Sequence, residues 1–95
     1  MLTEKEKNDL KSCGMQTYIQ YYNYFQTLER SALKKKMAHE YQYTMNSINT
    51  KISKGIKLTK TKELRKRILE HIINAKKLNT EERVKAQKLL LTECS

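Results

Sequence analysis

The side chains that most often carry out chemistry are few in this sequence and stand apart from one another. The two histidines, His39 and His71, have no second His, Cys or Asp at the short spacings of metal sites. Cys13 and Cys94 lie near opposite ends of the chain and form no CxxC pair. The sequence contains no glycine-rich phosphate loop and no nucleophile elbow. We therefore expect a protein that is not an enzyme and that uses no metal and no cofactor.

Basic side chains are the most distinctive feature, and they suit anion binding rather than catalysis. The chain has 20 Lys and Arg against 10 Asp and Glu, a formal net charge of +10. Residues 1–30 are neutral, because four basic and four acidic side chains balance there. The excess is densest in residues 51–67, the basic segment, where eight basic side chains oppose only Glu63. The segment flanks Gly55, where we expect a helix junction that forms a positive pole.

A positive pole of this kind fits the phosphate backbone of a nucleic acid. Neutralising several phosphates releases counterions and gives affinity without base reading. Lys outnumbers Arg, which suits backbone contact better than bidentate base recognition. We expect DNA or RNA to be bound by Lys34, Lys35, Lys36, Lys51, Lys54, Lys57, Lys60, Lys62, Arg65, Lys66 and Arg67. Two alternatives stay open: the partner is an acidic or nucleic-acid-processing protein, or the lysines form a solvated face that serves solubility alone.

Aromatic residues form a second cluster in the neutral part of the chain. This aromatic segment contains Tyr18, Tyr21, Tyr22, Tyr24 and Phe25. Helical spacing places Tyr21 and Tyr24 on a different face from the other three, so one buried face cannot hold them all. Because Tyr packs an apolar body and keeps its hydroxyl hydrated, we expect a protein interface or a place in the core rather than a base-stacking platform. Together with the pole, this layout predicts a two-ended molecule, aromatic at one end and cationic at the other.

Composition favours helices as the elements that position these groups. The sequence has no proline and two glycines, too few turn-forming residues for a fold of many strands. Thr3 and Glu6 have the spacing of a capping box, which predicts the start of a helix over residues 4–13. Gly14 follows that helix and is expected to end it with a positive φ.

The remaining helices are predicted from apolar spacing and from threonine caps. Residues 15–54 carry apolar side chains at helical spacing, which predicts either one long helix or two helices that meet near residue 30. Thr61 and Thr80 are expected to cap two further helices, over residues 61–77 and 80–92. We expect these two helices to form an ordinary helical hairpin rather than a DNA-reading helix-turn-helix. The second helix begins with two glutamates, whose negative charge is unfavourable next to phosphates.

The 95 residues thus predict one all-α domain, a small bundle of four to five helices with one long central helix, and a helical dimer is an alternative arrangement. The charged residues that follow Met1 lack the apolar run of a secretory signal. The longest aliphatic run, residues 89–91, is far too short to cross a bilayer. We therefore expect a cytoplasmic protein without membrane contact, in which both cysteines are free thiols.

In size, basicity and bias toward Lys, Asn, Ile and Tyr, the chain resembles small accessory proteins of bacteriophages, plasmids and other mobile elements of AT-rich bacteria. This resemblance of class implies an accessory or regulatory factor that contacts nucleic acid. The alternative that it implies is a stoichiometric inhibitor or adaptor that binds a host protein or nucleoprotein complex, with the aromatic segment as its apolar anchor. A bacteriocin-immunity-type helical bundle is a third hypothesis that fits the size and the charge.

Overall fold

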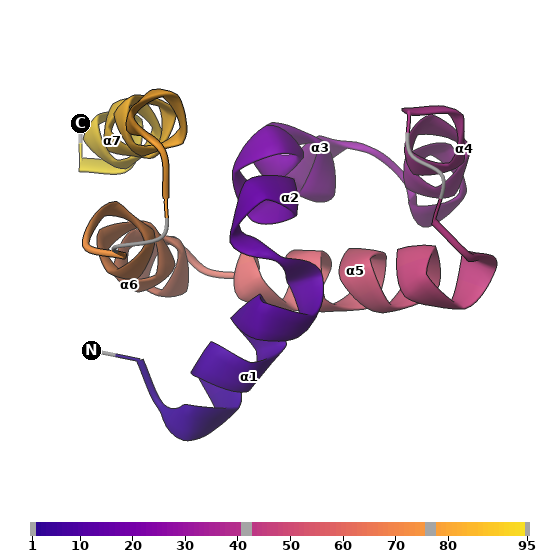
Figure 1. Cartoon of the computed structure of the whole chain (residues 1–95), viewed down its shortest axis with the longest axis horizontal. Helices are drawn as coiled ribbons and strands as arrows, with labels where there is room; N and C mark the ends of the chain where they lie inside the picture. Colours follow the sequence, from indigo (N-terminus) through magenta and orange to yellow (C-terminus); the bar gives the residue numbers. More distant parts are fainter. Residues whose placement is uncertain (1, 41–42, 76–77, 95) are drawn as a thin grey trace.

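A computed structural model describes residues 2–40, 43–75 and 78–94. These residues form seven helices and no strand, which confirms the all-α prediction (Figure 1). The count exceeds the predicted four to five, because the region expected to be one long helix is divided. In chain order the helices are α1 (Glu4–Cys13), α2 (Met15–Gln20), α3 (Tyr22–Thr27), α4 (Arg30–Glu40), α5 (Met45–Leu58), α6 (Lys62–Ile73) and α7 (Thr80–Cys94).

The start and the end of α1 confirm the prediction made from local signals. The backbone N–H of Thr3 donates to Oε1 of Glu6 at 2.9 Å, and the N–H of Glu6 donates to Oγ1 of Thr3 at 3.1 Å. These two bonds are the predicted capping box. Gly14 follows the helix with a φ of 92°, a backbone conformation that residues with a Cβ rarely adopt.

The caps of the last two helices confirm one prediction and correct the other. The Thr61 hydroxyl accepts from the N–H of Leu64 at 3.2 Å, so α6 begins as predicted. For α7, the side-chain oxygen of Asn79 accepts from the N–H of Glu82 at 2.8 Å. The prediction of Thr80 as the cap is therefore wrong by one residue, and Asn is at least as good a cap as Thr. The predicted end of the preceding helix at residues 76–77 lies outside the described residues.

The prediction of one helix over residues 15–54 is wrong, and the alternative break near residue 30 is present. The chain bends at Tyr21, where φ is −105° and ψ is 13°. It then leaves the helical conformation at Leu28, which is extended with ψ at 149°. A further helix starts after Thr44, whose side chain accepts from the N–H of Ser47 at 3.2 Å. No Gly or Pro marks these breaks, so only tertiary packing explains them.

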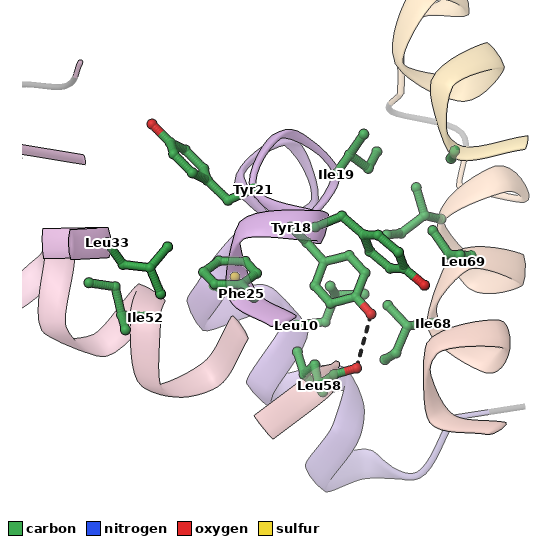
Figure 2. Packing of buried hydrophobic residues seen from close by; sticks show 14 of the residues in the cluster. Leu10, Tyr18, Ile19, Tyr21, Phe25, Leu33, Ile52, Leu58, Ile68 and Leu69 are labelled. Carbon is green, nitrogen blue, oxygen red and sulfur yellow. Dashed lines mark hydrogen bonds between the residues drawn. The ribbon is translucent and has the colours of Figure 1, made fainter. Parts of the chain in front are cut away.

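In that packing, α3 and α4 fold back onto α5. Both α3 and α4 pack against α5, and Leu33 of α4 and Ile52 of α5 are both fully buried. Figure 2 shows these two side chains next to each other, with Phe25 of α3 on the same side of α5. One continuous helix would leave this apolar stripe in water, at a cost of about 25 cal/mol for each Å² of apolar surface.

Gly55 lies inside α5 rather than at a helix junction, which corrects the sequence-based prediction. It is buried, and a Cβ built on it would lie 2.3 Å from Cζ of Phe25. The missing side chain therefore lets α3 approach α5 closely. The helix continues to Leu58, and Thr59 caps its end.

The elements extend from α5 in two directions (Figure 1). At the C-terminal end of α5, α6 and α7 pack side by side as a helical hairpin. At the N-terminal end of α5 lies α4, so α4 and α6 are at opposite ends of the same helix. None of the described helices combines the length and the apolar character that a membrane span requires.

Candidate nucleic-acid interface

The fold divides the eleven predicted binding residues into two groups. Lys34, Lys35 and Lys36 belong to α4, whereas the other eight belong to α5, α6 and the turn between them. Because α4 and α6 lie at opposite ends of α5, the lysines of α4 stand apart from the basic residues of α6 (Figure 1). The basic segment, rather than the full set, is therefore the candidate interface.

An aspartate of α1 forms ion pairs with two lysines of the basic segment. Asp9 is buried, and its two carboxylate oxygens lie 2.9 Å from Nζ of Lys54 and 3.2 Å from Nζ of Lys57. The hydrogen bond from Lys54 is the main reason that the pKa of Asp9 lies below its ordinary value. The side chain of Lys57 remains 49% exposed, so only this lysine of the two is well placed for an external anion.

The two arginines of the basic segment are structural ties. Arg67 binds Glu6 of α1 in a bidentate pair, Nη1 to Oε1 and Nη2 to Oε2, both at 3.0 Å. Arg65 donates from Nε to Glu93 of α7 at 3.0 Å and from Nη1 to the carbonyl of Thr59 at 2.9 Å. Burial alone would raise the pKa of Glu93, but hydrogen bonds from Arg65 and from a tyrosine hold it below the ordinary value.

Lys51 and Lys36 also have partners within the molecule. Nζ of Lys51 donates to the carbonyl of Cys13 at 2.9 Å. The Cys13 thiol is buried, which raises its pKa to about 12 and leaves it unreactive. On α4, Lys36 pairs with Glu40 at 2.9 Å, and its Nζ lies 4.6 Å from the ring centroid of Tyr24.

These pairs overturn the prediction of a neutral end and a separate cationic end. The eight basic side chains of the basic segment share their surroundings with Glu6, Asp9 and Glu93 in addition to Glu63. The first two carboxylates come from the neutral N-terminal third, which packs directly against α5 and α6. The pole is therefore weaker than its sequence indicates, and its remaining charge sits on fewer residues.

The charge that remains is concentrated where α5 ends and α6 begins. Within the described parts of the chain, no carboxylate lies at ion-pair distance from Lys60, Lys62 or Lys66, and only a longer-range attraction links Lys62 to Glu93. Lys62 and Lys66 are one turn apart on α6, so they share a face. With the half-exposed Lys57 they make a compact cationic surface, which we name the α5–α6 corner: Lys57, Lys60, Lys62 and Lys66.

A surface pocket of about 520 Å³ opens at this corner, between α3, α5 and the start of α6. Three cations and no carboxylate line it. Its polar lining consists of Gln26, Ser53, Lys57, Thr59, Lys60 and Arg65, and its apolar lining of Phe25 and Ile56. Arg30 adds a further cation at the edge, because its guanidinium donates to the Ser53 hydroxyl. We name this the corner pocket.

Sequence reasoning missed several contributors to the corner pocket, among them Gln26, Arg30 and Ser53. Arg30 and Ser53 are 23 residues apart and meet only because α4 folds back on α5. No spacing or motif in the sequence indicates that contact. The cations Lys57 and Lys60 were found from charge density alone.

Four of the five aromatic candidates lie in the core of this chain. Tyr18, Tyr21, Tyr22 and Phe25 are at most 5% exposed, and only Tyr24, at 40%, reaches solvent. These four side chains therefore pack in the core of this chain, the alternative that stood beside a protein interface. Figure 2 shows Tyr18 and Tyr21 pointing to different sides of the α2–α3 bend. The bend gives each ring its own apolar surroundings, which one straight helix could not do.

Two of the buried tyrosines, Tyr18 and Tyr22, donate hydrogen bonds from their hydroxyls. The Tyr18 hydroxyl donates to the carbonyl of Leu58 at 2.9 Å, the dashed line in Figure 2. The Tyr22 hydroxyl donates to Oε1 of Glu93 at 2.8 Å. Burial raises the pKa of Tyr18, so it stays neutral and acts as a structural donor.

No group of three His, Cys, Asp or Glu side chains gathers closely enough to hold a metal ion in residues 2–40, 43–75 and 78–94. Comparison of the chain with protein-family models, curated proteins and solved structures finds no match. Function is therefore inferred from the geometry and the charge of the α5–α6 corner.

Proposed function

We propose that this protein binds nucleic acid through the phosphate backbone, without catalysis, at the α5–α6 corner. The observation that carries the proposal is a set of lysines, Lys60, Lys62 and Lys66, with no described carboxylate at ion-pair distance, together with a pocket whose charged lining residues are all cations. Elsewhere in the basic segment, carboxylates of α1 and α7 pair with Lys54, Arg65 and Arg67. At the corner the like charges repel one another until an external polyanion neutralises them.

The role that fits this binding is that of an accessory or regulatory factor, the class that the sequence resembles. A protein that contacts backbone and not base edges acts by occupying or coating nucleic acid rather than by selecting one sequence. Lys34, Lys35 and Lys36 belong to α4, which lies at the other end of α5 from α6, so they are proposed as a secondary contact.

The test is the salt dependence of binding. Fluorescence anisotropy with labelled DNA and RNA oligonucleotides, from about 50 to 200 mM salt, should give an affinity that falls linearly on a log–log plot. The triple variant Lys60→Gln/Lys62→Gln/Lys66→Gln should lower the steepness of that line by about 2–3, since each lost phosphate contact removes about 0.7–0.9.

The matched control changes the net charge equally at another place. Lys5, Lys7 and Lys88 are exposed on α1 and α7, and no described carboxylate pairs with them. Their triple Gln variant should keep at least most of the wild-type slope. The proposal is wrong if no oligonucleotide binds at about 100 mM salt, or if both triple variants reduce the slope equally.

Arg65 and Arg67 are unsuitable for this test although they belong to the basic segment. Reversing their charge would break the pairs with Glu93 and Glu6, and a carboxylate left without its cation destabilises the fold. A loss of binding in such variants would report unfolding of α6 rather than a lost phosphate contact.

The second candidate function is a stoichiometric inhibitor or adaptor that binds a protein. Its predicted anchor, the aromatic segment, is largely buried. A different surface favours this function, because Val84 and Leu91 of α7 are 42% and 69% exposed and lie two turns apart. Affinity capture with and without nuclease separates the two functions: a partner protein retained after nuclease, and lost with Leu91→Ala, would support the inhibitor or adaptor.

A further inference from the structure

The corner pocket has more structure than backbone binding requires. Besides its cations, its lining includes half-buried Ile56 and Phe25, which is 5% exposed. Phosphates need only the cations, because they carry no apolar surface. An apolar lining beside cations instead fits a ligand with both an anionic and an apolar part.

The polar groups of the pocket are placed to hydrogen-bond such a ligand. The Gln26 amide gives one N–H to the carbonyl of Tyr22 at 3.0 Å. Within the described chain, its second N–H and its oxygen have no partner and can reach a ligand in the pocket. The Ser53 hydroxyl accepts from Arg30 and can still donate its own proton.

A nucleotide combines these chemistries: a phosphate, an apolar base face and a hydrogen-bonding base edge. In a duplex the base faces are stacked inside the helix and cannot reach a pocket, whereas an unpaired strand can turn a base outward. The volume of about 520 Å³ falls within the range of about 300–1,000 Å³ typical of small-molecule pockets.

Building on the proposed function, we infer that the α5–α6 corner binds single-stranded nucleic acid and seats one unstacked base in the corner pocket. The base rests on Ile56 and the edge of Phe25, and Gln26 and Ser53 bond its edge. Lys57 and Lys60 take the neighbouring phosphates. Arg65, fixed by Glu93, forms a rigid wall of the pocket.

Charge alone predicts a preference for duplex over single-stranded nucleic acid. A duplex has a higher density of phosphates than a single strand, so a surface that reads only the backbone binds duplex at least as well. Base insertion reverses that order. The affinity for an unstructured single strand should exceed that for a duplex by at least about fivefold, the lower end of the contribution of one stacked base.

The closing experiment compares three probes of equal length with the wild-type protein at one salt concentration. The probes are a single strand, a duplex, and a single strand whose sugars carry no bases. The base-free strand should bind at least about fivefold more weakly than the normal strand. Equal binding of these two strands overturns the inference but leaves backbone binding intact, whereas no binding of any probe overturns the proposed function as well.

A variant places the effect in the pocket. Ser53→Leu fills the pocket with a residue that favours helix, so it should abolish the preference for the normal strand over the base-free strand while circular dichroism stays unchanged. Ser12→Leu, at an exposed serine of α1, is the matched control and should keep the preference. A preference retained in Ser53→Leu, or tighter binding of a poly-glutamate peptide than of the single strand, contradicts the inference.

Discussion

At the scale of single residues, Gly55 determines how closely two helices approach. It lies in the middle of α5, where glycine costs about 1 kcal/mol of helix stability relative to alanine. The ring of Phe25 occupies the space that a Cβ would fill, and that ring is held in the core by its neighbours. The lower helix stability at Gly55 is therefore offset by the tight packing of α3 on α5.

Gly55→Ala should destabilise the protein although alanine is the better helix former. A Cβ 2.3 Å from Cζ of Phe25 forces the ring or the helix to shift. The expected net loss is about 1–2 kcal/mol, overpacking minus the gain in helix propensity. Urea unfolding followed by circular dichroism measures it, with Thr50→Ala on the exposed side of α5 as the control. Equal stability of the two variants would show that Phe25 does not limit the packing.

At the scale of elements, local signals in the sequence predicted helix starts but not helix breaks. The starts of α1 and α6 were found from Thr3 and Thr61, whose caps act within three residues. The breaks at Tyr21 and Leu28 have no such signal, because they arise where apolar side chains turn toward α5. Whether the chain breaks at these positions depends on contacts with residues that are distant in sequence. The apolar periodicity alone therefore predicted a helix that is too long.

The tie between α7 and the rest of the fold gives a prediction at this scale. Glu93 binds Arg65 of α6 and Tyr22 of α3, and both partners are largely buried. Glu93→Gln should cost about 2 kcal/mol at pH 7, typical of hydrogen bonds to a charged group, and should speed amide exchange in α7. Glu70→Gln, at an exposed position of α6, should change stability by less than about 0.5 kcal/mol.

The pH dependence of this difference has a definite sign. The folded protein holds the pKa of Glu93 below its ordinary value of 4.5, so the carboxylate stabilises the fold above that pH. The stabilisation is lost as the pH falls through the lowered pKa. The gap between wild type and Glu93→Gln should stay constant from about pH 7 to 5 and narrow below about pH 4.5. A constant gap down to pH 2 would contradict a charge-dependent tie.

At the scale of the whole molecule, folding redistributes the charge that the sequence displays. The charge density of the basic segment predicted that Lys60, Lys62 and Lys66 belong to a basic surface, and no described carboxylate lies at ion-pair distance from them. It could not predict that Arg65 and Arg67 bind carboxylates 28 and 61 residues away, because those pairs exist only after α1 and α7 pack on α6. Nor could it predict the corner pocket, since Arg30 reaches Ser53 only because α4 folds back on α5. Counting charges along a chain therefore overstates the surface available to a polyanion.

The most direct test of the central claim is a map of the binding surface by NMR. A titration of ¹⁵N-labelled protein with an unstructured single strand of about eight nucleotides, at about 100 mM salt, would follow each backbone amide. We predict that the largest shift changes occur over residues 57–66 and at Gln26 and Ser53, with the exposed face of α7 near Leu91 unchanged. Changes concentrated on α7, or none at any residue, would contradict the assignment of the α5–α6 corner as the nucleic-acid interface.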